Sequence, residues 1–214
     1  MAKIEWFRRT SWTERDAAEF DDRLARSRGG DRKAQYLRIQ AVHLFETGDL
    51  CLTRVALGLI DRLLAEFPDP FQLAPALSLR AEALVDLGRP DEALETYARA
   101  LAARRAFPQV GDDGYIGYAE LILALRRQEL YDAALEALDE FADSVQFPVQ
   151  EFRVAACRAL IASDLGDSNT ARRRAREALE AAAKSESPFR YHRKLGLVRG
   201  VDPLAFQRLQ SLAA

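Results

Sequence analysis

The chain contains few side chains of the types that carry catalysis or bind metals. It has two histidines, His43 and His192, and two cysteines, Cys51 and Cys157. Neither histidine has a second histidine or a cysteine at the spacing of a metal site. His43 lies in a segment with helical periodicity and is interpreted as a helix-surface or helix-packing residue. His192 lies in a basic stretch and is open to a structural or a functional role.

Motifs that assemble catalytic sites are also missing from the sequence. Gly111-Asp112-Asp113-Gly114 resembles a fragment of a calcium loop, but the remaining oxygen ligands and the closing glutamate are absent. A polar loop between helices is the better interpretation. There is no nucleophile elbow and no glycine-rich phosphate loop. We therefore expect a protein that is not an enzyme and that uses no catalytic residue, metal or cofactor.

Two clusters of cations need an explanation. Three consecutive arginines, followed by Arg176, fall in a helical segment where they can pair with Glu177 and Glu180. The tail from Phe189 to Lys194 interleaves aromatic and basic residues, a composition that stacks on bases and neutralises phosphate. A cap whose aromatic residues plug the last repeat explains the tail equally well. The candidate nucleic-acid-binding residues are Arg172, Arg173, Arg174, Arg190, His192, Arg193 and Lys194.

Composition narrows the class of protein. The chain has 214 residues, 49% of them hydrophobic, and a formal net charge of −2, which excludes the gross basic excess of a general nucleic-acid binder. No apolar run is long enough to span a membrane, and no secretory segment follows Met1. The two cysteines fall in separate repeats and are not expected to form a disulfide. A reducing cytoplasm is the expected location.

A regular spacing of prolines marks internal repeats. Phe-Pro occurs at Phe67-Pro68, Phe107-Pro108 and Phe147-Pro148, and Pro188 continues the series, so each step is 40 residues (108−68, 148−108, 188−148). The intervening segments are rich in Ala, Leu, Arg and Glu with helical periodicity. Because proline has no backbone donor and disfavours the helical conformation of the residue before it, each proline is expected to separate two helices. The pattern predicts an array of helix pairs.

The second repeat resembles a tetratricopeptide repeat. Residues 74–101 read APALSLRAEALVDLGRPDEALETYARAL, with small Ala81 between Leu77 and Leu84 in the first helix. Gly88 suits the left-handed residue that ends this helix, and Pro90 suits the first turn of the next. Small residues at such positions let two helices approach closely.

The other repeats match this pattern less closely. The alanine that opens the second helix recurs as Ala56, Ala93, Ala134 and Ala171. The small residue of the first helix recurs as Ala41, Ala81 and Ala159, with Ile122 in the third repeat, and the turn glycine as Gly48, Gly88 and Gly166, with Glu129 in the third. Tetratricopeptide repeats have a period of about 34 residues, so HEAT-type repeats, with periods nearer 40, remain the alternative.

The resulting prediction is an all-α superhelix, or solenoid, of about four tetratricopeptide-like helix pairs with capping helices at both ends. The predicted segments are an N-terminal cap at 1–32, repeats at approximately 33–68, 69–108, 109–148 and 149–188, and a C-terminal capping segment at 189–214. Thr13 is expected to cap the first helix, and Asp202 with Pro203 is expected to begin the last. Atypical ends of this kind cover the exposed core of a repeat array.

The resemblance implies a function as a protein-binding scaffold, because the first helix of each tetratricopeptide pair lines a concave groove. Transferred to this chain, that face comprises Arg38, Val42, Phe45, Ser78, Glu82, Val85, Leu123, Arg126 and Leu160, with Ala119 and Ala156 beside them. No lysine or asparagine falls on this face, so the class that clamps chaperone C-termini is not expected. A groove with valine, leucine and phenylalanine at its floor suits an apolar helix or an extended peptide. RNA binding through the basic C-terminal end is the alternative.

Overall fold

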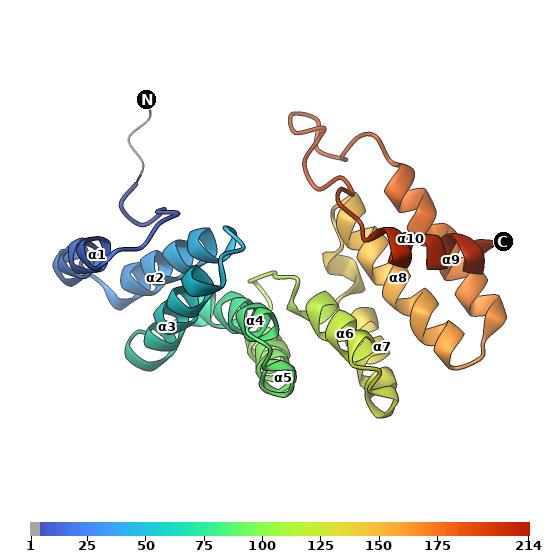
Figure 1. The fold of residues 1–214 in the computed structure, drawn as a ribbon, viewed down its shortest axis with the longest axis horizontal. Helices are drawn as coiled ribbons and strands as arrows, with labels where there is room; N and C mark the ends of the chain where they lie inside the picture. The colour runs from blue at the N-terminus through green and yellow to red at the C-terminus, as the bar shows by residue number, and fades with distance from the viewer. Residues whose placement is uncertain (1–4) are drawn as a thin grey trace. The chain divides into compact units, whose positions relative to one another are not determined.

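The computed structural model describes residues 5–214, and this part of the chain contains ten α-helices, two short 3₁₀ helices and no strand (Figure 1). The predicted all-α class, with helices packed in neighbouring pairs, is confirmed. In chain order the elements are α1 (Glu14–Arg26), α2 (Gly30–Phe45), α3 (Leu50–Glu66), α4 (Pro70–Asp86), α5 (Pro90–Ala106), α6 (Gly114–Ala124), η1 (Gln128–Leu130), α7 (Tyr131–Glu140), η2 (Ala142–Ser144), α8 (Pro148–Asp164), α9 (Ser168–Ala183) and α10 (Pro203–Ala213).

The chain forms two compact units, which divide between Gly114 and Tyr115. In the first unit α2 packs on α3, α4 packs on α5, and α3 links the two pairs through its contact with α4. In the second unit α8 packs on α9, and α10 lies against both of them. At the start of the second unit, the rings of Tyr115 in α6 and Phe141 at the end of α7 are in contact, with centroids 5.6 Å apart.

Small residues occupy the helix contacts where the sequence predicts them. Ala41, Ala81 and Ala159 in the first helices are fully buried, and the alanines of the second helices are at most 1% exposed (Ala56, Ala93, Ala134 and Ala171). Ile122, which takes the place of alanine in the third repeat, is also fully buried. These positions are therefore buried, as close helix contacts require.

Prolines and capping residues set most of the helix boundaries. Pro70, Pro90, Pro148 and Pro203 each lie in the first turn of a helix, where a missing backbone N–H leaves no hydrogen bond unmade. Asp69 caps α4 by accepting a hydrogen bond from the N–H of Phe71 at 3.0 Å. Pro75 lies inside α4, which begins before the segment that resembles a tetratricopeptide repeat. Pro188 lies in a loop and starts no helix.

The turns between paired helices share one backbone conformation. Gly48, Gly88 and Gly166 have φ of 71°, 73° and 82°, the left-handed region that glycine enters without a side-chain clash. The third repeat also has a left-handed turn residue, but it is Arg126, with φ of 54°. Matching Glu129 to the turn glycine was therefore wrong: Arg126 lies two residues after the end of α6, as Gly88 does after α4.

The N-terminal region packs on the first repeat, as a cap must. Thr13 caps α1 in a reciprocal capping box with Asp16. Phe20 in α1 belongs to the buried core that α2 and α3 share. Trp6, in the segment before α1, contacts Phe20 and Tyr36 with ring centroids 5.1 and 4.9 Å away. These contacts cover apolar side chains of the first repeat.

The C-terminal helix, α10, covers apolar side chains of the last helix pair, α8 and α9. Asp202 caps α10 by accepting a hydrogen bond from the N–H of Ala205 at 3.0 Å, as predicted. Leu209 of α10 is buried in a core with Ala159 of α8 and Ala178 of α9. This core places one face of α10 beside the first helix of the last pair, and that placement forms the site described next.

Candidate functional site

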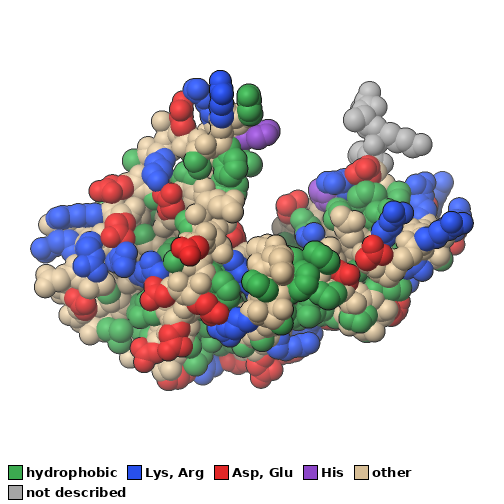
Figure 2. All heavy atoms as spheres, turned by 180° about the vertical axis from the view of Figure 1, so that it is seen from behind, with side chains coloured by type: hydrophobic (Ala, Val, Ile, Leu, Met, Phe, Trp, Pro, Cys, Tyr) green, Lys and Arg blue, Asp and Glu red, His purple; other side chains and the backbone are tan. Residues whose placement is uncertain are grey.

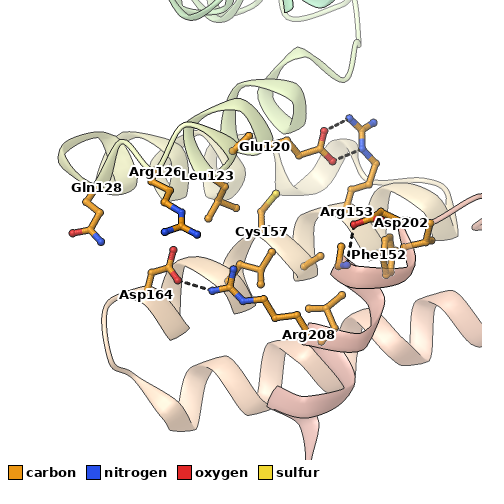
Figure 3. Close-up of a pocket in the computed structure, with 16 residues that line it drawn as sticks. Glu120, Leu123, Arg126, Gln128, Phe152, Arg153, Cys157, Asp164, Asp202 and Arg208 are labelled. Atoms are coloured by element: carbon orange, nitrogen blue, oxygen red, sulfur yellow. Dashed lines mark hydrogen bonds and ion pairs between the residues drawn. The ribbon is translucent and has the colours of Figure 1, made fainter. Parts of the chain in front are cut away.

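A pocket of about 780 Å³ lies in the second unit, lined by α6, α8, α10 and the turn after α6. Figure 3 shows the side chains of these elements pointing towards a common space. The helices that form it are the first helices of the third and fourth repeats, together with the C-terminal capping helix. In position it corresponds to the face on which the sequence predicts a groove.

The floor of the pocket is apolar. Phe152, Ala156 and Leu160 of α8 follow one another at intervals of four residues, so they lie on one stripe of the helix. Leu123 of α6 and Leu209 of α10 face the same space. Phe152 and Leu209 are buried, whereas Leu123 and Leu160 are only partly buried. The floor therefore offers apolar surface that the fold itself does not fully cover.

A paired charge lies at one end of the pocket. The guanidinium of Arg153 in α8 donates two hydrogen bonds, of 2.7 and 2.6 Å, to the two carboxylate oxygens of Glu120 in α6. This fork-on-fork geometry is the strong form of an ion pair. Cys157 lies one helical turn further along α8, and its burial raises the pKa of the thiol, which therefore stays protonated.

A second group of polar side chains occupies the other end. Asp164 at the end of α8 accepts a hydrogen bond of 2.8 Å from the hydroxyl of Tyr131 in α7 and one of 2.6 Å from Arg208 in α10. Burial and the bond to the carboxylate raise the pKa of Tyr131. The carboxylate thus joins three helices and is committed to two donors.

Arg126 differs from the other charged residues of the pocket. Its side chain points into the pocket on the same side as Asp164 and Arg208 (Figure 3). Asp202, the remaining acid, is used as the cap of α10. Within the described residues 5–214, the side chain of Arg126 makes no hydrogen bond or ion pair; its backbone N–H donates to the carbonyl of Leu123 at 3.0 Å. It is therefore the one cation of this pocket, in the described part of the chain, whose donors are available to a ligand.

The predicted groove residues of the second unit come together here. Leu123, Arg126, Ala156 and Leu160 all line the pocket. Ala119 does not, because it is fully buried in the core. It precedes Leu123 by one helical turn, and its inclusion on the groove face was wrong.

In the first unit most of the predicted groove residues are engaged within the unit. Val42 and Phe45 pack against the core that α2 and α3 share. Arg38 in α2 donates a hydrogen bond of 2.6 Å to the side-chain carbonyl of Gln72 in α4, and burial lowers its pKa. Glu82 is partly buried, and Val85, 38% exposed, is the most accessible of the set.

Ser78 is not a groove residue, because it is only 6% exposed and belongs to a buried polar cluster. Its hydroxyl donates to the carboxylate of Asp112. The guanidinium of Arg104, 3% exposed, donates to the backbone carbonyl and to the carboxylate of the same residue. Gly111, Asp112 and Asp113 thus form a loop between α5 and α6, as predicted, and this cluster holds the loop to α4 and α5.

The basic cluster of α9 behaves as a helix surface. Arg174 pairs with Glu177 at 2.8 Å, as predicted, and Arg176 donates to the backbone carbonyl of Ala213 at 2.9 Å. Arg172 and Arg173 are exposed. Two of the four arginines therefore have partners within the second unit.

The basic tail folds back on the beginning of α8. The rings of Phe189 and Phe147 stack with centroids 5.0 Å apart, and the N–H of Val149 donates to the carbonyl of Gly196 at 2.8 Å. Gly196 has φ of 67°, and a Cβ at this position would overlap the ring of Phe147. Phe189 thus packs on Phe147 at the start of α8, although it stays 39% exposed.

The exposed end of this tail carries an aromatic residue and several cations. Tyr191 is 84% exposed, and the guanidinium of Arg190 lies 5.6 Å from its ring centroid. Figure 2 shows cations, a histidine and hydrophobic side chains gathered on the segment that follows α9. Because the tail contacts the start of α8 whereas Arg172 lies near the start of the antiparallel α9, the two clusters are separated by about 15 Å along the helix pair.

Several pocket residues were missed by the sequence analysis. Phe152 could have been found, because it continues the stripe of Ala156 and Leu160 by one turn. The pairs Glu120–Arg153 and Asp164–Arg208 join residues far apart in the chain. No local sequence pattern indicates such long-range pairs, and neither pair was predicted.

The described residues were also searched for metal sites and membrane spans. Within residues 5–214 no group of three or more His, Cys, Asp or Glu side chains could hold a metal ion. None of the helices in this range has the length and apolar character needed to cross a bilayer.

Comparisons with known proteins give a likeness of fold. No protein-family model matches the chain, and no curated protein matches it. Among solved structures, the crystal structure of BtubC (BKLC) from P. vanneervenii is similar, with a TM-score of 0.53 and 21% sequence identity over 94% of this chain and 81% of that one. At this identity the likeness concerns the fold alone.

Proposed function

We propose that this chain is a non-catalytic, tetratricopeptide-like scaffold that binds a peptide segment of a partner protein in the pocket of its second unit. The observation that carries the proposal is the uncovered apolar stripe of α8 and α6, bounded at both ends by charged side chains. Grooves between neighbouring helices that combine an apolar floor with polar ends suit helical or extended peptides. Leu123 and Leu160 supply floor positions that a partner side chain would cover.

The absence of a free acid or base in the pocket supports a binding role over a catalytic one. Glu120 is held by Arg153, and Asp164 by Tyr131 and Arg208. The protonated thiol of Cys157 is a weak nucleophile. A general acid or base must be able to reach a substrate proton, and these groups are committed to structural partners.

We further propose the cytoplasm as the compartment of the protein. Cys51 is exposed and Cys157 is buried, and both are free thiols. An exposed free cysteine is best tolerated where thiols are kept reduced.

RNA binding through the tail is a second candidate, supported by one observation. Tyr191 and Arg190 together present an exposed aromatic ring beside a cation. Such a pair can stack on an unpaired base while neutralising phosphate. The peptide site is favoured because it has a shaped pocket, whereas the tail offers a small surface remote from the arginines of α9.

Selection from a random peptide library on the immobilised full chain tests the main proposal. Selected peptides should bind the wild type and lose at least tenfold in affinity with Leu123→Asp, which places a carboxylate on the pocket floor. Leu204→Asp is the matched control, because Leu204 is 75% exposed on α10 outside the pocket and its replacement should leave binding unchanged. Circular dichroism verifies that both variants fold.

The same preparations distinguish the RNA candidate. A labelled single-stranded RNA of mixed sequence should bind weakly, and with no loss in Leu123→Asp, if the peptide proposal is right. Strong RNA binding that falls with Arg190→Ala and with added salt, together with no selected peptide, would favour the second candidate.

A further inference from the structure

The turn after α6 uses a residue that its conformation disfavours. Arg126 is the one non-glycine residue of the described part of the chain with positive φ. The left-handed conformation brings the Cβ of an ordinary residue close to a backbone oxygen and is therefore unfavourable, whereas glycine adopts it freely. The corresponding turns of the second and fourth repeats have Gly88 and Gly166.

The backbone of this turn gives no reason for an arginine. The three turns close with the same hydrogen bond, from Arg89 N to Leu84 O at 2.8 Å, from Asp167 N to Ala162 O at 2.9 Å, and from Arg127 N to Ile122 O at 3.1 Å. Glycine therefore satisfies the same turn in two repeats of this chain. Backbone strain of this kind concentrates at functional sites, so an explanation should be sought in the side chain.

The side chain of Arg126 is directed at the pocket, and its guanidinium donates no hydrogen bond to the described residues. It lines the pocket near Asp164 and Arg208 (Figure 3). The other cations of the pocket, Arg153 and Arg208, are each paired with an acid. Arg126 has no such partner in residues 5–214. An arginine held there against its backbone preference offers a planar set of donors at the edge of an apolar floor.

We infer that Arg126 is the specificity-determining residue of the pocket and that it binds the side-chain carboxylate of an aspartate or glutamate flanked by large apolar residues. Guanidinium and carboxylate groups match in a bidentate pair. Leu123, which lies in the last turn of α6 and also lines the pocket, would contact the flanking apolar residue. This inference rests on the proposed peptide site.

The surrounding charges limit the ligand to a single negative group. Asp164 lies at the same end of the pocket, and Glu120 lies at the other. The pocket has three acids, including Asp202, against three arginines, so it has no excess of positive charge to balance a dianion such as a phosphorylated side chain. A single carboxylate balances Arg126 without a second unpaired charge.

The test uses peptides displayed with both ends joined to the carrier, so that no free C-terminal carboxylate is present. Peptides that require Leu123 are sequenced, and a selected acidic peptide is measured against wild type, Arg126→Gln and Arg126→Gly. Arg173→Gln is the matched control, because it removes the same charge from the exposed surface of α9, outside the pocket. Replacing the acidic residue of the peptide by its amide completes a double-mutant cycle.

We expect the selected peptides to be enriched in aspartate or glutamate beside apolar residues. Arg126→Gln should weaken the acidic peptide about tenfold, equivalent to about 1.4 kcal/mol, and should have little further effect on the amide peptide. Arg173→Gln should bind as the wild type does. Arg126→Gly should lose the same affinity and should also have a higher denaturation midpoint than the wild type. A misfolded variant would lose affinity without this rise in the midpoint.

The result separates this inference from the proposal on which it rests. Peptides that require Leu123 but show no acidic enrichment, and that bind Arg126→Gln as tightly as wild type, overturn the role of Arg126 and leave the peptide site standing. If no peptide depends on Leu123, the proposed function itself is wrong, and the role of Arg126 is rejected with it.

Discussion

The helix pairs α4–α5 and α6–α7 have the same turn conformation but differ in the exposure of their polar residues. Those of α4–α5 are buried, whereas those of the α6–α7 turn are accessible. In the first, the turn residue is Gly88, and Ser78 of the leading helix is enclosed with Arg104 and Asp112. In the second, the turn residue is Arg126, which faces a pocket lined by residues of the second unit. The two turns have the same backbone conformation, but their polar side chains are placed differently: one set is buried and the other faces a pocket.

This difference shows how one repeat can contribute to stability and another to binding. The polar groups of the α4–α5 pair are buried and satisfied by one another, so they hold the following loop in place. Those of the α6–α7 turn remain accessible, and one of them occupies an unfavourable backbone conformation. Mutations in the two pairs should therefore act on different properties: stability for the first, and affinity for the second.

The largest expected effect comes from breaking the buried cluster of the α4–α5 pair. Asp112→Ala removes the carboxylate that pairs with the buried guanidinium of Arg104, which should lower the free energy of unfolding by about 3 kcal/mol. Urea denaturation followed by circular dichroism measures the change. Peptide binding at 25 °C should be unaffected, because none of these residues lines the pocket.

Ser78→Ala supplies the graded control for that prediction. It removes one neutral donor to the carboxylate and keeps the pair with Arg104, so about 1 kcal/mol of stability should be lost. If Asp112→Ala is no worse than Ser78→Ala, the buried pair contributes nothing beyond a single hydrogen bond, and the contrast between the two helix pairs fails.

Much of the fold follows from local physical requirements that leave a trace in sequence. Close helix contacts need small residues, which is why the alanines at Ala81 and Ala93 gave the register. Left-handed turns favour glycine, which is why Gly88 and Gly166 were placed correctly. The helical period alone placed Leu123 and Leu160 on one side of their helices, and both line the pocket.

The rest depends on features with no local signature. A left-handed arginine has no sequence pattern, so the turn was assigned to Glu129 in place of Arg126. Ser78 appeared accessible because its partner Asp112 lies in a loop that helical periodicity does not describe. Asp164 and Arg208 come together because α10 packs against α8. The sequence of neither segment indicates this contact.

Exchanging the turn residues gives an effect of intermediate size. Gly88→Arg should lower the free energy of unfolding by about 1 kcal/mol, because the position has positive φ although a Cβ there would meet no atom within 4 Å. Arg126→Gly should raise it by a similar amount. Denaturation midpoints of the two variants should thus move in opposite directions; a loss of stability in both would mean that the arginine side chain supports its own turn.

The smallest expected effect is a dependence of stability on pH that comes from Asp112, in the buried cluster of the α4–α5 pair. Burial raises the pKa of Asp112 above its ordinary value, against the opposing pull of the Ser78 hydroxyl and of Arg104, and the neighbouring Asp113 adds to the rise. Folding then disfavours the charged carboxylate. The contribution of this group is present while it is protonated, and it is lost as pH rises from the ordinary aspartate value through the raised one.

Asp112→Asn isolates this contribution, because the amide keeps the shape of the side chain and does not titrate. The stability of the wild type relative to Asp112→Asn should fall as pH rises through that window and then level off; urea unfolding of both proteins at a series of pH values measures the difference. A relative stability that instead increases with pH would mean that the charge of Arg104 outweighs burial and lowers the pKa of Asp112. The sign of the slope therefore decides whether desolvation or the ion pair dominates the buried cluster that distinguishes this helix pair from α6–α7.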